Sequence, residues 1–126
     1  YCASHEIGLM TYGTLHGGLL SGRRVCADES RAELRSTFYS CYDAQGWERI
    51  QKLLNTMKEI AAAHQAETSE VALNWALAQP GVTCVLCGST KPTTAVTNAK
   101  AAGWQLSADE LAAIEGCRQE IFDSAQ

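Results

Sequence analysis

Residues 82–99 of the 126-residue chain read VTCVLCGSTKPTTAVTNA, and this stretch decides the fold. The run 82–87 is mostly apolar and uninterrupted, which is typical of a strand buried on both faces of a parallel sheet. Gly-Ser-Thr at 88–90 predicts a tight turn, and Pro92 suits the first turn of a helix that we expect over 91–102. A strand followed by a tight turn and a helix is the building unit of parallel α/β folds.

The chain on the N-terminal side of this unit repeats the same alternation. Residues 7–12 form another short apolar run and predict a second buried strand. Apolar residues at three- and four-residue spacing predict helices within 46–79, and the last of these is apolar nearly all round. Either Thr68 or Ser69 is expected to cap it. Two apolar strands that alternate with helices predict a parallel sheet covered by helices on both faces.

Two further segments complete the predicted order. Residues 13–45 form a long loop, glycine-rich at its start and polar beyond, and loops of this length are often functional. Ser107 and Glu110 have capping-box spacing ahead of an amphipathic helix over 107–122. Two strands cannot make a covered sheet alone, and the chain begins at Tyr1 rather than Met. We therefore expect an incomplete α/β domain, half a barrel or half a doubly wound sheet, whose N-terminal part is missing.

Composition narrows the possible functions. The chain is 46% hydrophobic and 19% charged, which is ordinary for a globular domain and excludes wholesale disorder. The 10 Lys and Arg residues against 14 Asp and Glu give a net charge of −4 without a basic patch, which argues against binding to nucleic acid. No apolar run approaches the roughly 18–20 residues that span a bilayer, so no membrane span is expected.

The cysteines predict a reducing environment rather than a disulfide framework. Several lie in apolar or helical segments, where a reduced Cys behaves as a small buried hydrophobe. Cys84 and Cys87 have the spacing of a metal-binding or redox motif, but residues three apart on a strand point to opposite faces, so we predict no metal site. The expected location is the cytoplasm or another reducing compartment such as an organelle stroma. The six are Cys2, Cys26, Cys41, Cys84, Cys87 and Cys117.

The turn before the helix over 91–102 is a candidate phosphate site. Backbone N–H groups and the positive end of the dipole bind anions at a helix N-terminus. Ser89 and Thr90 add hydroxyl donors there, and Lys91 adds a cation. The alternative is simply a capped turn with a solvated lysine, and the residues alone leave both interpretations open.

The end of the strand over 7–12 supports the ligand-binding interpretation. The ring of Tyr12 could stack on a flat heterocycle, and Gly17 and Gly18 would let a ligand approach the backbone closely. A half-buried core position is the alternative for Tyr12. His16 has no carboxylate at a fixed spacing, so we do not expect it to act as an acid or base.

Three segments together resemble the C-terminal part of the aldo-keto reductase family. They are IGLMTYGTLHGGLLSGR (7–23), LLNTMKEIAAAHQAETSEVALNWALAQPGVTCVLCGST (53–90) and NAKAAGWQLSADELAAIE (98–115), in the family's order and spacing. The resemblance covers the chain from about Ile7 to Ile121. It implies the C-terminal part of a (β/α)8 TIM barrel, in which 7–12 is the seventh strand, 82–87 the eighth and 107–122 an extra helix after the eighth unit.

The resemblance also implies a cofactor, NADP(H), that lies across the strand ends, and barrels of this kind commonly bind phosphate after their last two strands. The positions that match the family's cofactor-binding residues are Tyr12 at the nicotinamide; Gly13, Thr14, Leu15, Gly17 and Arg23 along the pyrophosphate; Gly88, Ser89, Thr90 and Lys91 around the adenosine 2′-phosphate; and Thr94, Thr97 and Asn98 at the adenine and its ribose. The family's catalytic Asp, Tyr, Lys and His lie in its N-terminal half. No residue here matches them, so no catalytic residue is assigned.

Three of these positions depart from the family pattern. The family usually has Pro where Thr14 stands, Gln or Arg at Thr94 and often Glu at Thr97, whereas Asn98 is kept. Two long polar contacts at the adenine end are thereby shortened. The resemblance therefore implies weakened cofactor affinity or a different geometry at the adenine end.

The resemblance implies one function, and the departures of this sequence from the family pattern leave a second function open. The first is part of an NADP(H)-dependent reductase that converts aldehydes or ketones to alcohols by hydride transfer, with this segment supplying cofactor binding. The second is a degenerate, non-catalytic subunit of a larger assembly, structural or regulatory. In either case the N-terminal half or partner subunits must cover the strand edges, so residues 1–126 alone are expected to associate.

Overall fold

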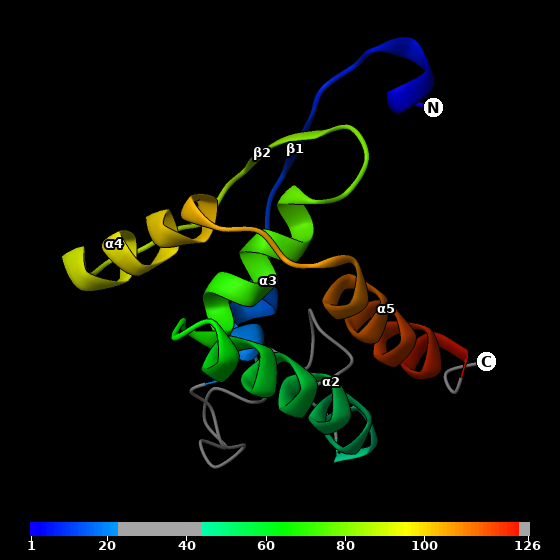
Figure 1. Cartoon of the computed structure of the whole chain (residues 1–126), viewed down its shortest axis with the longest axis vertical. Helices are drawn as coiled ribbons and strands as arrows, with labels where there is room; N and C mark the ends of the chain where they lie inside the picture. Colours follow the sequence, from blue (N-terminus) through cyan, green and yellow to red (C-terminus); the bar gives the residue numbers. More distant parts are fainter. Residues whose placement is uncertain (23–43, 124–126) are drawn as a thin grey trace.

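The computed structural model describes residues 1–22 and 44–123 (Figure 1). Arg23 and most of the predicted loop over 13–45 lie outside the described residues. In chain order the elements are η1 (Ala3–His5), β1 (Leu9–Thr11), η2 (His16–Ser21), α2 (Ala44–Ala63), α3 (Thr68–Leu77), β2 (Val82–Val85), α4 (Pro92–Lys100), η4 (Ala101–Gly103) and α5 (Ala108–Asp123), where η marks a 3-10 helix. The described chain is therefore of the α/β class, as its sequence predicts.

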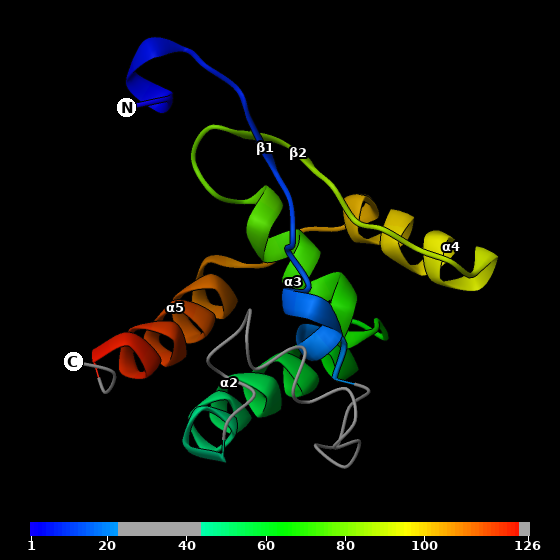
Figure 2. The same ribbon diagram turned by 180° about the vertical axis from the view of Figure 1, so that it is seen from behind.

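β1 and β2 form a parallel pair and run side by side in the ribbon views (Figures 1 and 2). This parallel pairing is the arrangement that two apolar strands separated by helices predict. The register contains one irregularity, because Leu9 faces Val82 while Met10 faces Cys84. The hydroxyl of the intervening Thr83 donates a hydrogen bond to the Leu9 carbonyl at 3.2 Å, so a side chain bridges the two strands at the irregular position.

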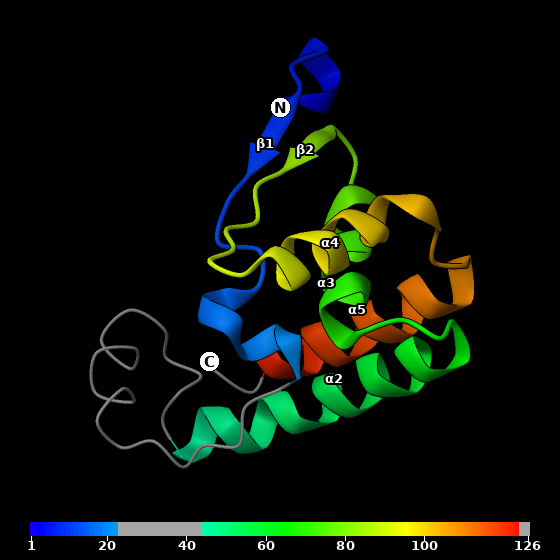
Figure 3. The ribbon, with the colours of Figure 1, turned by 90° about the vertical axis from the view of Figure 1, so that its left-hand side faces the viewer.

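The strands differ from the sequence prediction in length and in burial. Predicted over 7–12 and 82–87, they cover three and four residues, and Met10 in the middle of β1 is 63% exposed. The described residues alone therefore do not bury the strands on both faces. The physical reason is that each strand has one neighbour, whereas an apolar strand needs several neighbours and covering helices. The strands project beyond the helices, which gather at one end of the molecule (Figure 3).

The hydrophobic core lies among η2, α2, α3 and α5 rather than beside the strands. α2 packs against both α3 and α5, and η2 packs against α3. α3 is buried nearly all round, as its apolar composition predicts. The core residues are Leu19, Ile50, Leu53, Leu54, Met57, Ile60, Ala61, Val71, Ala72, Leu106, Ile114 and Cys117. This core holds α3, and α3 in turn packs against β2 and α4.

The sequence predicts the N-terminal cap of α5 correctly and that of α3 incorrectly. Ser107 and Glu110 form the predicted capping box at α5, since the Ser107 N–H donates to Glu110 Oε2 at 2.8 Å and the Glu110 N–H donates to Ser107 Oγ at 3.3 Å. The prediction that Thr68 or Ser69 caps α3 is wrong. Glu67 takes that position with an extended backbone, because Thr68 and Ser69 are already buried residues of the helix.

The described residues contain no membrane-spanning helix, no metal-binding cluster and no disulfide. Within 1–22 and 44–123, no helix is long and apolar enough to cross a membrane. The same part of the chain contains no group of three or more His, Cys, Asp or Glu side chains that could hold a metal ion. The cysteines it includes are all free thiols, namely Cys2, Cys84, Cys87 and Cys117.

Candidate functional site

The two loops that the sequence singles out leave the sheet at the same edge. β1 ends at Thr11 and β2 at Val85, and these residues are partners in the parallel register. Just beyond them, the Leu86 N–H donates a hydrogen bond to the Thr11 carbonyl at 2.8 Å. The segments 12–17 and 86–91 therefore start beside each other at the carboxyl ends of the strands (Figure 3). Parallel α/β folds bind their ligands at this edge.

Tyr12 is the first residue after β1, and it is 87% exposed. Gly13 follows with a φ of 67°, in the left-handed region that favours glycine, and its carbonyl accepts the His16 N–H at 2.8 Å. The hydroxyls of Thr11 and Thr14 form a hydrogen bond of 3.4 Å across the turn. The chain thus reverses directly after the strand and leaves the ring of Tyr12 accessible. The alternative of a half-buried Tyr12 is wrong for the described residues.

The glycine-rich segment that follows is shaped by η2. The side chain of Leu15 packs against the hydrophobic core, and its carbonyl accepts the Gly18 N–H at 2.9 Å. Gly17 and Gly18 have φ values of 64° and 94°, which produce a kink inside η2. Because the core takes up its side chain, Leu15 can meet a ligand with its backbone only.

A cleft of about 390 Å³ opens between β1, η2 and the helices α2, α3 and α5. Trp75 and Met57 contribute to its largely apolar wall, and His16 and Gln79 also line it. Burial lowers the pKa of His16, which favours the neutral imidazole. No local sequence pattern predicts this cleft, because its wall is assembled from segments that lie far apart in the chain.

The loop after β2 is exposed and leaves room at its first residue. Gly88 has no atom within 4 Å of the position that a Cβ would take, so a ligand can approach its backbone closely. Ser89 Oγ accepts the Lys91 N–H at 3.2 Å and donates to the Lys91 carbonyl at 2.7 Å. This hydroxyl, a predicted phosphate donor, is therefore engaged in holding the turn, whereas Thr90 beside it is exposed.

Lys91 is the N-cap residue of α4, and Pro92 occupies the first turn as predicted. The Lys91 carbonyl accepts the N–H groups of Thr94 at 3.1 Å and Ala95 at 3.2 Å. Its side chain is exposed, and its ammonium has no ion-pair partner in the part of the chain that the structure describes. An unpaired cation beside the positive end of a helix dipole makes this a favourable place for an anion.

Asn98, near the end of α4, is 7% exposed, and neither its Nδ2 nor its Oδ1 has a hydrogen-bond partner among residues 1–22 and 44–123. It lines a second cavity of about 390 Å³ between β2, α3 and α4, together with Thr83 and Cys84. A buried amide without partners costs roughly 1–3 kcal/mol. The amide of Asn98 is thus available to hydrogen-bond to a group that enters this cavity.

The predicted site residues fall into two groups. One group surrounds α4 and comprises Gly88, Ser89, Thr90, Lys91, Thr94, Thr97 and Asn98. The other follows β1 and comprises Tyr12, Gly13, Thr14, Leu15 and Gly17. Within the first group, the Thr97 hydroxyl donates to the Thr93 carbonyl at 3.1 Å, so it is engaged with its own helix, and the Thr94 side chain is half-buried. Arg23 belongs to neither group, since it lies outside the described residues.

Comparisons with known proteins show the family of the chain. The model of the "Aldo/keto reductase family" matches residues 1–119. Protein tas of Escherichia coli (strain K12) is 30% identical over 113 residues, which cover 90% of this chain and 32% of that protein. Aldo-keto reductase str7 of Strobilurus tenacellus is 28% identical over 120 residues, which cover 93% of this chain and 35% of that protein. The chain spans about a third of the length of these relatives. It belongs to the aldo/keto reductase family.

Proposed function

We propose that the chain forms the NADP(H)-binding part of a reductase that converts an aldehyde or ketone to an alcohol. The observation that carries this proposal is the buried amide of Asn98, whose donor and acceptor are both unpaired among the described residues. Adenine offers the complementary pair of groups, because an Asn amide binds the adenine N6 amino group and N7 together. Asn98 would therefore hold the base of the cofactor.

Lys91 would hold the adenosine 2′-phosphate. Its ammonium is exposed at the start of α4, where the helix dipole also favours negative charge. The open space at Gly88 would let the phosphate approach the backbone of the same turn. One helix would thus supply two parts of the grip on a single nucleotide, with the phosphate at its N-terminal end and the base near its C-terminal end.

Tyr12 would face the nicotinamide, since its exposed ring follows β1 at the edge where both loops begin. NADPH, when bound, supplies the hydride that reduces the carbonyl carbon. The described residues would bind and orient the cofactor, whereas the group that protonates the carbonyl oxygen is not assigned to any of them.

A titration with NADPH, followed by nicotinamide fluorescence, tests the proposal. Lys91→Ala and Lys100→Ala remove the same charge from opposite ends of α4. Wild-type protein should bind, and Lys91→Ala should weaken binding by about tenfold or more, the value of a hydrogen bond to a charged group. Lys100→Ala should bind like the wild type, because Lys100 lies away from the proposed phosphate position. Equal effects of the two substitutions would contradict the assignment of Lys91.

A second candidate function is favoured by two hydroxyl groups. Ser89 Oγ is engaged with the backbone of its own turn, and Thr97 Oγ1 with the backbone of its own helix. A degenerate, non-catalytic subunit of an assembly would have lost side-chain contacts to the cofactor in this way. A folded protein that does not bind NADPH in the titration would support this second function against the first.

A further inference from the structure

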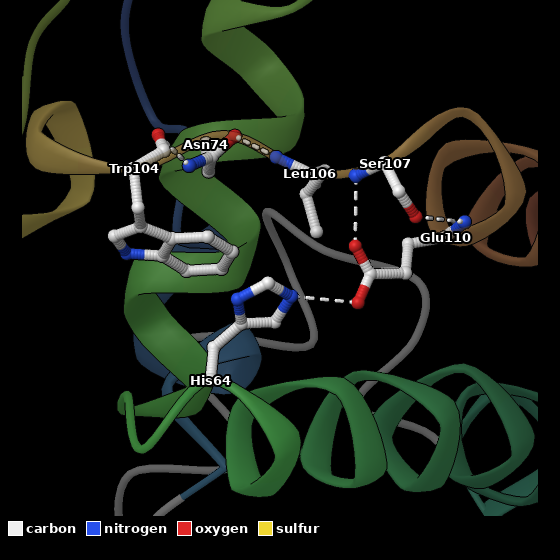
Figure 4. A network of polar contacts seen from close by, with 6 residues as sticks. All are labelled: His64, Asn74, Trp104, Leu106, Ser107 and Glu110. Atoms are coloured by element: carbon white, nitrogen blue, oxygen red, sulfur yellow. Dashed lines mark hydrogen bonds and ion pairs between the residues drawn. The ribbon is translucent and has the colours of Figure 1, made fainter.

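Asn74 lies in the middle of α3 and is 4% exposed. Its amide reaches the connection between α4 and α5 and makes three hydrogen bonds to the backbone there. Figure 4 shows those to Trp104 and Leu106. Nδ2 donates to the carbonyls of Ala101 at 3.2 Å and Trp104 at 2.6 Å, and Oδ1 accepts the Leu106 N–H at 3.2 Å. One side chain therefore fixes this connection at three points, beginning directly after the C-terminal end of α4.

α4 has little packing of its own to hold it in place. Asn98 is the only buried residue of this helix, and Val96 is 60% exposed. Helices in proteins are held mainly through a buried apolar face, and the described residues bury no such face on α4. The helix extends away from α2 and α5 (Figure 1). By contrast Ala101, the first residue after α4, is buried. The position of α4 is therefore set mainly at its C-terminal end.

The far side of the connection is tied to α2 and α5. The ring of Trp104 stacks on His64, with 4.4 Å between centroids and 24° between planes, and His64 Nε2 lies 2.7 Å from Glu110 Oε1 (Figure 4). The same carboxylate accepts the Ser107 N–H at 2.8 Å. Because these contacts anchor the connection to the core helices, the bonds from Asn74 are made to a segment that cannot shift freely.

We propose that Asn74 is a positioning residue for the nucleotide site, because its hydrogen bonds set how α4 lies against α3 and thereby where Lys91 and Asn98 lie. This inference rests on the proposed function. Lys91 and Asn98 are near opposite ends of a helix on which the described residues bury Asn98 alone. A small rotation about the C-terminal end of α4 would therefore move both away from a common ligand. Asn74 acts through the backbone of Ala101 and not by contact with the nucleotide.

Two substitutions test this role. Asn74→Asp keeps an acceptor for the Leu106 N–H. Its second carboxylate oxygen, however, replaces the donor to the Ala101 and Trp104 carbonyls and repels their oxygens. Asn74→Ala is milder, because it leaves room for water to bind the three backbone groups. We expect both to weaken NADPH binding by about threefold to thirtyfold, the range for a residue that acts at a distance from the ligand. Both should also speed hydrogen exchange of the α4 amides, measured by mass spectrometry far below the melting temperature.

Gln119→Ala is the matched control, because Gln119 Nε2 donates to Glu115 Oε1 within α5 at 3.3 Å, and Gln119 neither lines the cleft nor bonds to the connection. It should change neither NADPH affinity nor exchange in α4. Asn74 variants that melt at a lower temperature but keep wild-type NADPH affinity and wild-type α4 exchange would overturn the inference, since Asn74 would then be purely structural.

The exchange measurement separates this inference from the proposed function. If the wild-type protein does not bind NADPH, faster exchange in α4 of the Asn74 variants, and not in Gln119→Ala, still supports the positioning role. If neither Asn74 variant folds, hydrogen exchange of the wild-type protein tests the inference. Binding of adenosine 2′,5′-bisphosphate should then protect the Leu106 amide, because coupling between two sites is reciprocal. Unchanged protection of that amide would overturn the inference.

Discussion

Asn74 and Asn98 lie on neighbouring helices and are both buried, but their amides have opposite surroundings. Asn74 makes three hydrogen bonds to the backbone, whereas Asn98 makes none among the described residues. Buried amides in proteins are nearly always paired, so an unpaired one lowers the stability of the fold. Proteins tolerate such a violation mainly where function requires it, and a bound nucleotide would supply the partners that Asn98 lacks.

Asn98→Leu should raise the free energy of unfolding by about 1 kcal/mol, because it removes an unpaired amide and fills part of the cavity with apolar atoms. The same change should weaken NADPH binding. Urea denaturation and the NADPH titration measure the two effects. Asn74→Leu is the matched comparison and should lower the free energy of unfolding by about 2 kcal/mol or more, since three backbone groups lose their partners. Lower stability of Asn98→Leu together with unchanged affinity would contradict the role of Asn98.

Glu110 makes the stability of the fold depend on pH. The Ser107 N–H, with His64 beside it, holds the pKa of Glu110 below its usual value. Because the folded pKa is below the unfolded one, this stabilisation is complete above the usual carboxyl pKa and is lost as the pH falls through the lowered pKa. Glu110→Gln should therefore melt below the wild type at neutral pH, and the difference should shrink below about pH 4.

Thermal denaturation from neutral to acidic pH measures this difference in melting temperature. Glu59→Gln is the control, because Glu59 is an exposed carboxylate on α2 without a hydrogen-bond partner in the part of the chain described by the structure. Its melting temperature should follow that of the wild type at each pH. A gap between Glu110→Gln and the wild type that stays constant down to acidic pH would show that the charge of Glu110 is not the cause.

At the scale of secondary-structure elements, local signals predict the helix ends that depend on neighbours in sequence and miss those that depend on distant residues. The capping box at Ser107 is confirmed because both of its partners lie within one helical turn. The predicted cap of α3 is wrong because Thr68 packs against Gly22, where an added Cβ would lie 2.9 Å from Thr68 Oγ1. This contact makes Thr68 a buried helical residue, and the cap moves back to Glu67.

Gly22→Ala and Gly116→Ala should change stability in opposite directions. Gly22 ends η2 with a φ of 67°, so an alanine there adds backbone strain to the overlap with Thr68 and should cost about 1–3 kcal/mol. Gly116 lies inside α5 with no atom within 4 Å of its Cβ position, so alanine should stabilise by about 0.5–1 kcal/mol. Chemical denaturation measures both changes, and a destabilised Gly116→Ala would contradict the helical environment of that residue.

At the scale of the whole molecule, the sequence predicts topology well and side-chain orientation poorly. Two apolar strands separated by helices predict a parallel pair, and such a pair places the loops that follow both strands at one edge. The sequence does not predict that the hydroxyls of Ser89 and Thr97 bond to nearby backbone, or that the side chain of Leu15 packs against the core. The partner of each side chain depends on competition between local hydrogen bonds and tertiary packing. The spacing of apolar residues along the sequence does not predict the result of this competition.

The exposed apolar side chains of the strands predict that residues 1–126 associate when they are expressed by themselves. Met10→Glu should reduce this association, because it places a charge in the middle of β1. Val96→Glu is the control, since Val96 is nearly as exposed as Met10 but lies on α4. Size-exclusion chromatography with light scattering measures the state of association. A monomeric wild-type chain that unfolds cooperatively would contradict the prediction.

The most direct test of the account is a calorimetric comparison of adenosine 2′,5′-bisphosphate with adenosine 5′-monophosphate. The two ligands differ only in the 2′-phosphate and lack the nicotinamide, so they report on the α4 part of the site alone. We expect the bisphosphate to bind about tenfold more tightly or better, and Lys91→Ala to remove most of this preference. Equal binding of the two ligands, or a preference that survives Lys91→Ala, would contradict the assignment of the 2′-phosphate to the start of α4.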